Sequence, residues 1–296
     1  MSAFSRIVVS DRDEPNQPRP DALEINAPSA LSSPMPSPYS LPQIYDIAFD
    51  FRDVKGECDF LLSVGQAHLG RPVRSALELA CGPAYHAREM AKRGIISHGL
   101  DNSPEMVAYA NQLIAREKLN AEIIRADMCN FESFEKYDLC YILIASFAHL
   151  LTNRDILDNL NAVADCLNDD GLYIISTAHP RDFYGPDSPP EHEPSWTNSR
   201  AGITVTTHWG GTNQQFDPLT EIDDVVISFT VETNGQTARY DFPEKLRRLS
   251  LQTFQALVQS SGRFALVDMY GDFDANIKIS NAPESVRFIP VLQKLA

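Results

Sequence analysis

The stretch from Leu77 to His86, LELACGPAYH, places an acidic residue, a small residue and a Gly-Pro turn at the end of an apolar run. In a doubly wound α/β sheet, ligands bind at the carboxyl ends of the strands, where helix amino termini and bare backbone amides face the crevice. Asp101, in SHGLDNS, follows Glu78 by about 23 residues, where a carboxylate accepts two hydrogen bonds from ribose hydroxyls. The alternative is that Asp101 caps the next helix, although Ser103 suits that role better.

The turn differs from the dinucleotide fingerprint G-x-G-x-x-G. Only Gly82 is a glycine, and Ala80 and Ala84 take the flanking positions. A pyrophosphate would have to approach the backbone with fewer glycines than usual. The sequence therefore disfavours NAD and FAD as ligands.

His149 is the candidate catalytic residue, in YDLCYILIASFAHLLTNRD. An imidazole has an unperturbed pKa of about 6.5, so near the mouth of the sheet it could take a proton from an ammonium or a hydroxyl. A histidine that only caps a loop fits the sequence equally well, and both interpretations stay open.

From residue 75 onward, apolar runs of strand length alternate with segments of helical periodicity. Repeated β-α-β units of this kind build a parallel sheet with helices on both faces, so we expect a Rossmann-like, doubly wound, mostly parallel seven-stranded α/β fold. The expected strands are Ala76–Ala80, Ile95–Leu100, Ala121–Ala126, Leu139–Ile144, Leu172–Thr177, Phe264–Met269 and Val286–Leu292. The expected helices are Ala84–Arg93, Pro104–Glu117, Arg154–Leu167 and Leu251–Ser260.

Two regions interrupt this pattern. Between residues 181 and 249, the runs GITVTTHW, DDVVISFTVE and TARYDF are separated by Gly210-Gly211 and Asn234-Gly235, which predicts an antiparallel β insertion that covers the substrate. Residues 1–42 are rich in proline and lack apolar periodicity, which predicts a flexible tail before one domain of residues 43–296. A partner-binding proline segment is the alternative for the tail.

Composition argues against some classes of partner and some cellular locations. The net charge of −15 argues against a nucleic-acid partner, because phosphate binding needs a lysine and arginine surface. No run approaches the ~20 apolar residues that span a bilayer, and no signal peptide is seen, so we expect a cytoplasmic protein that does not bind membranes. The five cysteines lack C-x-x-C spacing, so we expect reduced, mostly buried thiols and no metal site.

The motifs together resemble those of class I S-adenosylmethionine-dependent methyltransferases, from about residue 43 to the end and most closely from Leu77 to Thr177. ELACGPA is similar to the family's first motif, an acidic residue followed by x-G-x-G-x-G with small residues tolerated at the outer positions. The resemblance implies S-adenosyl-L-methionine as the cofactor. It further implies that the cofactor is held by Glu78, the peptide of Ala80, Cys81 and Gly82, the carboxylate of Asp101 with Asn102, and Asp127 with Met128 in RADMCNF.

The segment around His149 resembles that of small-molecule N-methyltransferases, including those that dimethylate amino sugars. It lacks the [DN]-P-P-[YF] motif of enzymes that methylate nucleobase amines or protein glutamine. Several members of the resembled group keep a histidine that faces the substrate at the position of His149. IYDIAFDFRDVKGECDFLL is similar to the group's amino-terminal helical lid, which implies that Tyr45 closes over the cofactor and Arg52 pairs with its carboxylate.

The leading hypothesis is therefore an enzyme that transfers the methyl group of S-adenosylmethionine to a nitrogen, or less readily an oxygen, of a small molecule. A non-catalytic module that binds the cofactor or its product is the second reading. A nucleotide-dependent oxidoreductase is the third. The sequence leaves the acceptor, the number of methyl groups and the oligomeric state open.

Overall fold

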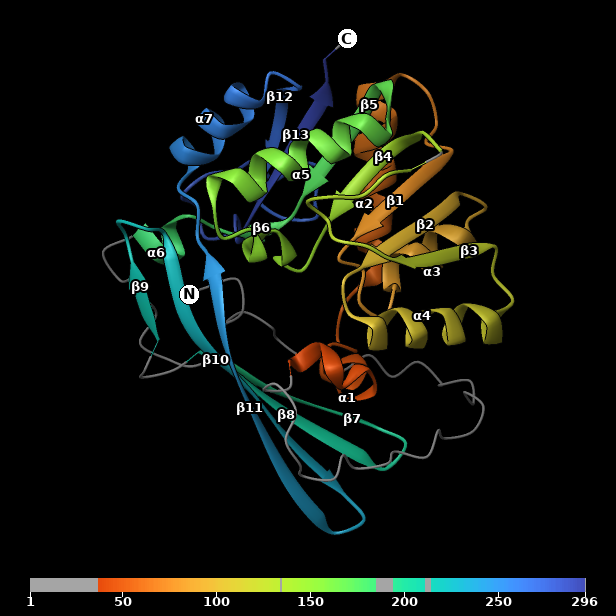
Figure 1. Ribbon diagram of the computed structural model, residues 1–296, viewed down its shortest axis with the longest axis vertical. Coiled ribbons are helices and arrows are strands. Elements are labelled where there is room, and N and C mark those ends of the chain that lie inside the picture. Colours follow the sequence, from red (N-terminus) through yellow and green to blue (C-terminus); the bar gives the residue numbers. More distant parts are fainter. Residues whose placement is uncertain (1–36, 134, 185–193, 211–213, 296) are drawn as a thin grey trace.

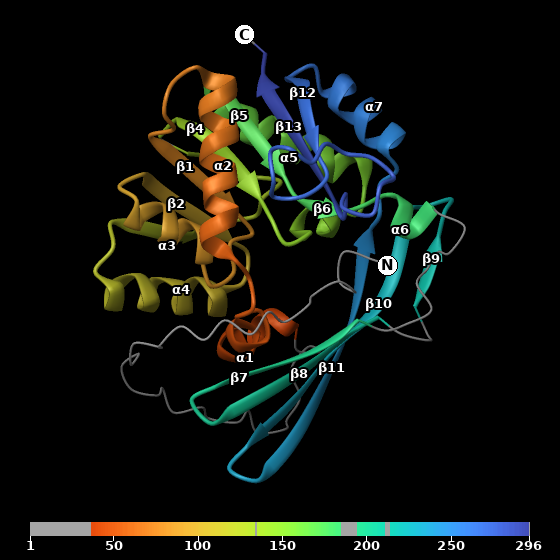
Figure 2. The same cartoon turned by 180° about the vertical axis from the view of Figure 1, so that it is seen from behind.

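The computed structural model describes residues 37–133, 135–184, 194–210 and 214–295, and Figures 1 and 2 show it from opposite sides. The described chain contains an α/β unit and, next to it, a long antiparallel sheet. Most of the expected tail, residues 1–36, and Gly211 of the expected Gly-Gly turn lie outside the described residues.

The central sheet has the strand order β12-β13-β5-β4-β1-β2-β3, so the expected mostly parallel sheet is confirmed, with one short strand more than the expected seven. β1 to β5 are parallel to one another, whereas β13 is antiparallel to both β5 and β12. A short strand, β6 (Thr177–Ala178), also pairs with β13. The seven strands are β1 (Ser75–Leu79), β2 (Ile96–Asp101), β3 (Ala121–Arg125), β4 (Tyr137–Ile142), β5 (Leu167–Ile175), β12 (Phe264–Tyr270) and β13 (Arg287–Lys294).

Helices cover both faces of this sheet. Alternation along β1 sends Leu77 and Leu79 into the core cluster under helices α5 and α7, whereas Ala76 packs in the cluster under α2 and α3. Glu78 therefore points, like Ala76, toward α2 and α3, and it is buried. The helices are α2 (Val54–Leu69), α3 (Tyr85–Lys92), α4 (Pro104–Glu117), α5 (Asn153–Cys166) and α7 (Leu251–Ser261).

The insertion between residues 181 and 249 starts with helix α6 (Arg181–Tyr184) and forms an antiparallel sheet of order β11-β10-β8-β7, with β9 paired to β10. Asn234 and Gly235, both with positive φ, connect β10 and β11 as the hairpin signal predicts. β7 and β9 were not among the expected strands, and β7, SWTNSR, has no apolar alternation that could indicate it. The strands are β7 (Ser195–Arg200), β8 (Ile203–Trp209), β9 (Gln215–Asp217), β10 (Ile222–Thr233) and β11 (Gln236–Arg247).

Helix α1 (Pro42–Ala48) lies between the two sheets, below the α/β unit in Figure 1. Its apolar residues share a core cluster with the antiparallel sheet, including Phe229 and Phe242. A 3₁₀ turn, η1 (Pro38–Ser40), precedes α1, so a helical turn lies within the expected tail of residues 1–42. The physical reason is that Pro38 is buried against the domain although its segment is rich in proline.

Candidate active site

The turn after β1 alternates residues in the left-handed backbone region, with φ of 48° at Ala80, 52° at Gly82 and 55° at Ala84. The Gly82 N–H donates to Oδ2 of Asp101 at 2.8 Å. A Cβ placed on Gly82 would have one described heavy atom within 4 Å, the Cε1 atom of Tyr45 at 4.0 Å. The turn therefore leaves a space beside Gly82, and Tyr45 lies on the other side of that space. Cys81 contributes backbone there, because its side chain is buried in the cluster between α3 and α4.

Asp101 ends β2 and joins two backbone segments. Its Oδ1 atom accepts a hydrogen bond from the Ser103 N–H at 2.9 Å, in addition to the bond from Gly82. Ser103 caps α4 as expected, because its side chain accepts from the N–H of Met106 at 3.2 Å. Burial raises the pKa of Asp101, and the backbone donors of Ser103, Gly82 and Asn102 oppose that effect. Next to it, Asn102 accepts from Arg125 Nε at 3.3 Å through its backbone carbonyl.

Glu78 is turned toward helix α3. Its Oε2 atom accepts from the Ala87 N–H at 2.8 Å, and its Oε1 atom lies 3.1 Å from Nδ1 of His86. These contacts hold the Glu78 carboxylate against the start of helix α3. His86 was not among the residues selected from the sequence, where a histidine inside an amphipathic helix gives no functional signal.

Tyr45 and Arg52 lie near each other beside the glycine turn. The charges of Arg52 and of Asp101 both act on the Tyr45 phenol, and burial raises its pKa most. Arg52 Nη2 donates to Glu57 Oε2 at 2.6 Å, and its side chain is 6% exposed. Among the described residues, the buried Nε atom of Arg52 has no hydrogen-bond partner. Tyr45 thus lies beside Gly82, Gly82 is bound to Asp101, and the charge of Arg52 acts on the Tyr45 phenol.

Asp127 and Met128 follow β3, the strand beside β2. Asp127 is exposed, and its Oδ1 atom accepts from the Cys129 N–H at 2.8 Å. Met128 packs against the core cluster under α5, and its carbonyl accepts from Asn159 Nδ2 at 2.8 Å. The loop stands at the same edge of the sheet as Asp101, and no hydrogen bond joins Asp127 to the other predicted site residues that the structure describes.

His149 ends a 3₁₀ turn, η2 (Ser146–His149), just after β4. The connection is strained, because Ile144 and Ala145 have φ of 56° and 57°. Nε2 of His149 lies 2.7 Å from the phenol oxygen of Tyr39. Burial, and after it the charge of Arg248, lowers the pKa of His149 to about 4. This lowered pKa differs from the ordinary imidazole value on which the proposed base role of His149 rests, and its main cause is the partial burial of the ring.

Three residues near His149 were missed in the sequence. Tyr39 lies in the segment expected to be a tail, and its Oη, backbone carbonyl and ring contact His149, Ser103 and Tyr45 respectively. Glu244 on β11 is partly buried, burial raises its pKa, and its charge acts on Tyr39. Arg248 follows β11 and is buried against Asp223. No local sequence pattern marks these three positions, because each reaches the site only through the packing of distant segments.

All five cysteines are free thiols, and four of them are buried. Among the described residues, no group of three or more His, Cys, Asp or Glu side chains is arranged to hold a metal ion. No helix in the described ranges is long and apolar enough to cross a membrane.

Comparison with known proteins points to one class. Residues 76–171 match the methyltransferase domain family. Over 213 residues, the chain is 25% identical to a glycine/sarcosine/dimethylglycine N-methyltransferase from Actinopolyspora halophila, covering 69% of this chain and 33% of that protein. The chain spans 40% and 33% of the lengths of two curated relatives, this N-methyltransferase among them.

Two solved structures share the fold. An S-adenosylmethionine-dependent methyltransferase from Clostridium acetobutylicum matches with a TM-score of 0.70 at 18% identity, over 86% of this chain and 97% of that chain. The sugar N-methyltransferase KedS8 from Streptoalloteichus matches with a TM-score of 0.68 at 15% identity, over 93% of this chain and 100% of that chain. At these identities the likeness concerns the fold.

The sheet order, the glycine turn and these matches define a class I S-adenosylmethionine-dependent methyltransferase domain. Residues 76–171 are the part of the chain that matches the methyltransferase domain family. The cofactor of the domain is S-adenosylmethionine.

The described residues fit this cofactor. Gly82 leaves space beside its Cα, so that an added Cβ would find one described atom at 4.0 Å. The buried Arg52 Nε without a described partner suits an anionic group such as a carboxylate. Asp101, at 9% exposed, suits hydroxyl donors.

Proposed function

We propose that the chain transfers the methyl group of S-adenosylmethionine to a nitrogen, or less readily to an oxygen, of a small-molecule acceptor. The observation that supports this most is the neutral imidazole of His149, which shares a 2.7 Å hydrogen bond with the Tyr39 phenol at the carboxyl end of β4. Two neutral groups that can both donate and accept suit an uncharged amine, which is the nucleophilic form of a nitrogen acceptor.

In this proposal the cofactor is held by residues Tyr45, Arg52, Ala80, Cys81, Gly82, Asp101, Asn102, Asp127 and Met128, with Glu78 fixing the turn from behind. When bound, S-adenosylmethionine supplies an electrophilic methyl group on a sulfonium. The protein's part is then to align the acceptor and exclude water, and alignment alone can contribute up to about 7 to 11 kcal/mol.

His149 acts in this proposal mainly by orienting the acceptor. A base with a pKa of about 4 cannot readily deprotonate an ammonium whose pKa is near that of a lysine, about 10. The acceptor therefore binds as the neutral amine, and its proton leaves to water after methyl transfer. Tyr39, whose pKa burial raises, stays a neutral phenol at working pH.

The relatives support nitrogen as the methylated atom. The Actinopolyspora enzyme is named for N-methylation of glycine and its methylated derivatives. KedS8 is described as a sugar N-methyltransferase, and its fold matches 93% of this chain. A small amine or an amino sugar is accordingly the acceptor class that we propose.

Turnover with a panel of acceptors tests this proposal. Purified protein would be incubated with S-adenosylmethionine and paired compounds, each amine beside the alcohol of the same skeleton, and S-adenosylhomocysteine formation would be measured. We expect turnover with an amine and little with its matched alcohol. Tight binding of S-adenosylhomocysteine without turnover of any amine would contradict the proposal and favour the non-catalytic binding module.

A further inference from the structure

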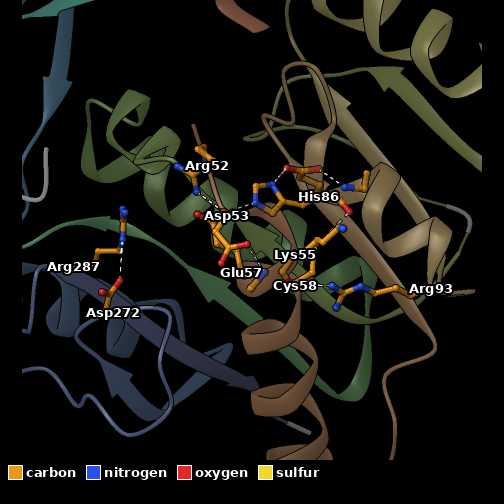
Figure 3. A network of polar contacts seen from close by, with 12 residues as sticks. Arg52, Asp53, Lys55, Glu57, Cys58, His86, Arg93, Asp272 and Arg287 are labelled. Atoms are coloured by element: carbon orange, nitrogen blue, oxygen red, sulfur yellow. Dashed lines mark hydrogen bonds and ion pairs between the residues drawn. The ribbon is translucent and has the colours of Figure 1, made fainter. Parts of the chain in front are cut away.

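A continuous chain of charged side chains runs behind the glycine turn (Figure 3). It begins at Arg52, whose Nη2 donates to Glu57 Oε2 at 2.6 Å. The same Glu57 oxygen lies 2.5 Å from Nε2 of His86, and the other ring nitrogen of His86 lies 3.1 Å from Glu78 Oε1. The chain thus joins the loop before α2 to helices α2 and α3 and to the end of β1.

The members of this chain are buried and balanced in charge. The side chain of His86 is 0% exposed, and those of Glu57 and Glu78 are 8% and 4% exposed. Two carboxylates, one guanidinium and one imidazolium sum to zero charge. Because an unbalanced buried charge is costly, the proton on His86 is held by this balance.

The pKa shifts agree with this geometry. Burial opposes the charge on His86, but hydrogen bonds from its ring to Glu57 and Glu78 outweigh burial and raise the pKa of His86. Burial also opposes the charge on Glu57, but the Arg52 charge and the His86 hydrogen bond lower the pKa of Glu57 to about 2.

The chain returns to the cofactor site through Arg52. The Arg52 charge acts on the Tyr45 phenol, and Tyr45 lies over Gly82. The Nε atom of Arg52 is buried and has no hydrogen-bond partner among the described residues. The Nη2 atom of Arg52 is therefore bound to Glu57, and the Nε–H remains available to donate to a ligand.

We propose that His86 is a positioning residue for the carboxylate of the cofactor, acting through Glu57 on Arg52. While His86 carries two ring protons, it neutralises one of the two carboxylates, and Glu57 shares its Oε2 atom between Arg52 and His86. When His86 loses a proton, the chain gains a net negative charge and Glu57 holds Arg52 more strongly. Both changes weaken the attraction of Arg52 for an incoming carboxylate.

The other groups around His86 do not replace its charge. The Sγ atom of Cys58 lies 4.0 Å from the His86 backbone carbonyl, and burial raises the pKa of that thiol. Tyr141 on β4 packs its ring against the imidazole, and burial raises its pKa as well. The charge of Arg287, at the start of β13, acts on Arg52 and Glu57 but is paired with Asp272.

The sign of the expected effect follows from these shifts. Because the pKa of His86 is raised, its charge is fully present below the ordinary value of 6.5 and is lost as the pH rises through the raised value. We expect the affinity for S-adenosylhomocysteine to fall about 5- to 10-fold across that rise, the order expected for removing one nearby charge.

Calorimetric titration with two ligands tests the proposal. S-adenosylhomocysteine carries the carboxylate, and 5′-methylthioadenosine has the same nucleoside and sulfur but no amino-acid part. Both would be titrated between pH 6 and pH 9 into wild type and His86→Gln. We expect the wild-type affinity for S-adenosylhomocysteine to fall with pH, and that of His86→Gln to be already lower by the same factor at pH 6. Methylthioadenosine should bind both proteins alike at every pH.

Two features keep the experiment decisive. The amine of S-adenosylhomocysteine titrates with both proteins, so the difference between wild type and His86→Gln isolates the protein's contribution. If His86→Gln does not fold, Glu57→Gln takes its place, because it breaks the same chain and should also remove the pH dependence. The proposal concerns the cofactor alone and needs no knowledge of the acceptor.

Arg93→Gln is the matched control. Arg93 also ties α3 to α2, through Asp59 at 2.6 Å and the Lys55 carbonyl at 2.9 Å, but no hydrogen bond or ion pair among the described residues joins it to Arg52 (Figure 3). It should keep the wild-type pH profile. Equal pH profiles for both ligands in wild type, or a wild-type profile in His86→Gln, would overturn the proposal. Failure of S-adenosylhomocysteine to bind at any pH would overturn the cofactor assignment and the proposal with it.

Discussion

Asp101 combines two functions in one carboxylate. Its oxygens accept the N–H groups of Gly82 and Ser103 at 2.8 and 2.9 Å, and it stands where ribose hydroxyls are expected. We expect Asp101→Ala to weaken S-adenosylhomocysteine binding by about 1.5 to 3 kcal/mol and to lower the melting temperature as well, because the backbone amides of Gly82 and Ser103 lose their acceptor. Calorimetry and thermal unfolding measure the two effects.

Asp217→Ala is the control for this substitution. Asp217 also accepts a backbone N–H, from Leu219 at 2.9 Å, but it is exposed and far from the glycine turn. It should leave the ligand affinity unchanged. Wild-type affinity in a folded Asp101→Ala protein would remove Asp101 from the cofactor site.

His149 makes stability depend on pH. Its pKa is lowered from 6.5 to about 4, so between pH 6.5 and pH 4 His149 binds a proton in the unfolded chain but stays neutral in the folded chain. Stability from this residue is therefore present above pH 6.5 and is lost as the pH falls toward 4. We expect wild type to lose about 1 to 2 kcal/mol more free energy of unfolding than His149→Gln between pH 7 and pH 5.

Urea unfolding of both proteins at the two pH values measures this difference. Parallel losses in wild type and His149→Gln would mean that the imidazole is accessible to water. The same variants separate orientation from proton transfer, because His149→Gln should keep much of the rate with an amine acceptor whereas His149→Ala should not. If the wild-type rate instead rises with pH through a pKa of 6 to 7 and both variants lose that rate, His149 would be the general base.

At the scale of elements, η1 is expected to contribute to stability, whereas residues 1–36 before it are not. Tyr39 contacts His149, Tyr45 and Ser103, whereas the composition of residues 1–36 shows no means of building a core. We expect deletion of residues 1–36 to leave the melting temperature nearly unchanged, and deletion of residues 1–40 to lower it by several degrees. Thermal unfolding of both truncated proteins gives the comparison.

Tyr39→Phe provides the finer control for this element. It keeps the ring against Tyr45 and His149 and removes only the hydroxyl, so it should cost about 1 kcal/mol, which is less than the longer deletion costs. Equal melting temperatures for the two truncations would show that η1 adds no stability to the domain.

At the scale of the whole molecule, a buried ion pair fixes the antiparallel sheet at the point where it leaves the α/β unit. Arg248 Nε donates to Asp223 Oδ2 at 3.0 Å, and the two side chains are 3% and 0% exposed. Gln214 Nε2 also donates to both Asp223 oxygens, each at 2.8 Å. The pair thereby fixes the position of β10 against the segment that leads into α7.

Removing one charge of the Arg248–Asp223 pair should lower the free energy of unfolding more than removing both charges does. We expect Arg248→Met to destabilise the protein by about 3 to 5 kcal/mol, because Asp223 is left buried without its cation. The double variant Asp223→Asn with Arg248→Met should recover a large part of that loss. A double-mutant cycle by denaturant unfolding measures the coupling, and additive effects would show that the two charges are independent.

Local patterns in the sequence determined much of this protein. The strand at residues 75–79, the helix at 104–117 and the Asn234-Gly235 hairpin fall within a few residues of their expected positions, because periodicity, caps and turn residues act over short distances. The order of carboxylates and the glycine turn along the chain likewise indicated the cofactor class.

Only the tertiary structure decided how the site works. Tyr39 and His149 are 110 residues apart, and His86 and Glu57 are 29 residues apart, so no local pattern pairs them. The lowered pKa of His149 depends on burial under a sheet whose strand β7 has no apolar alternation. Burial and charge balance are sums over every segment that packs around a group, and a single segment of sequence contains only its own contribution to them.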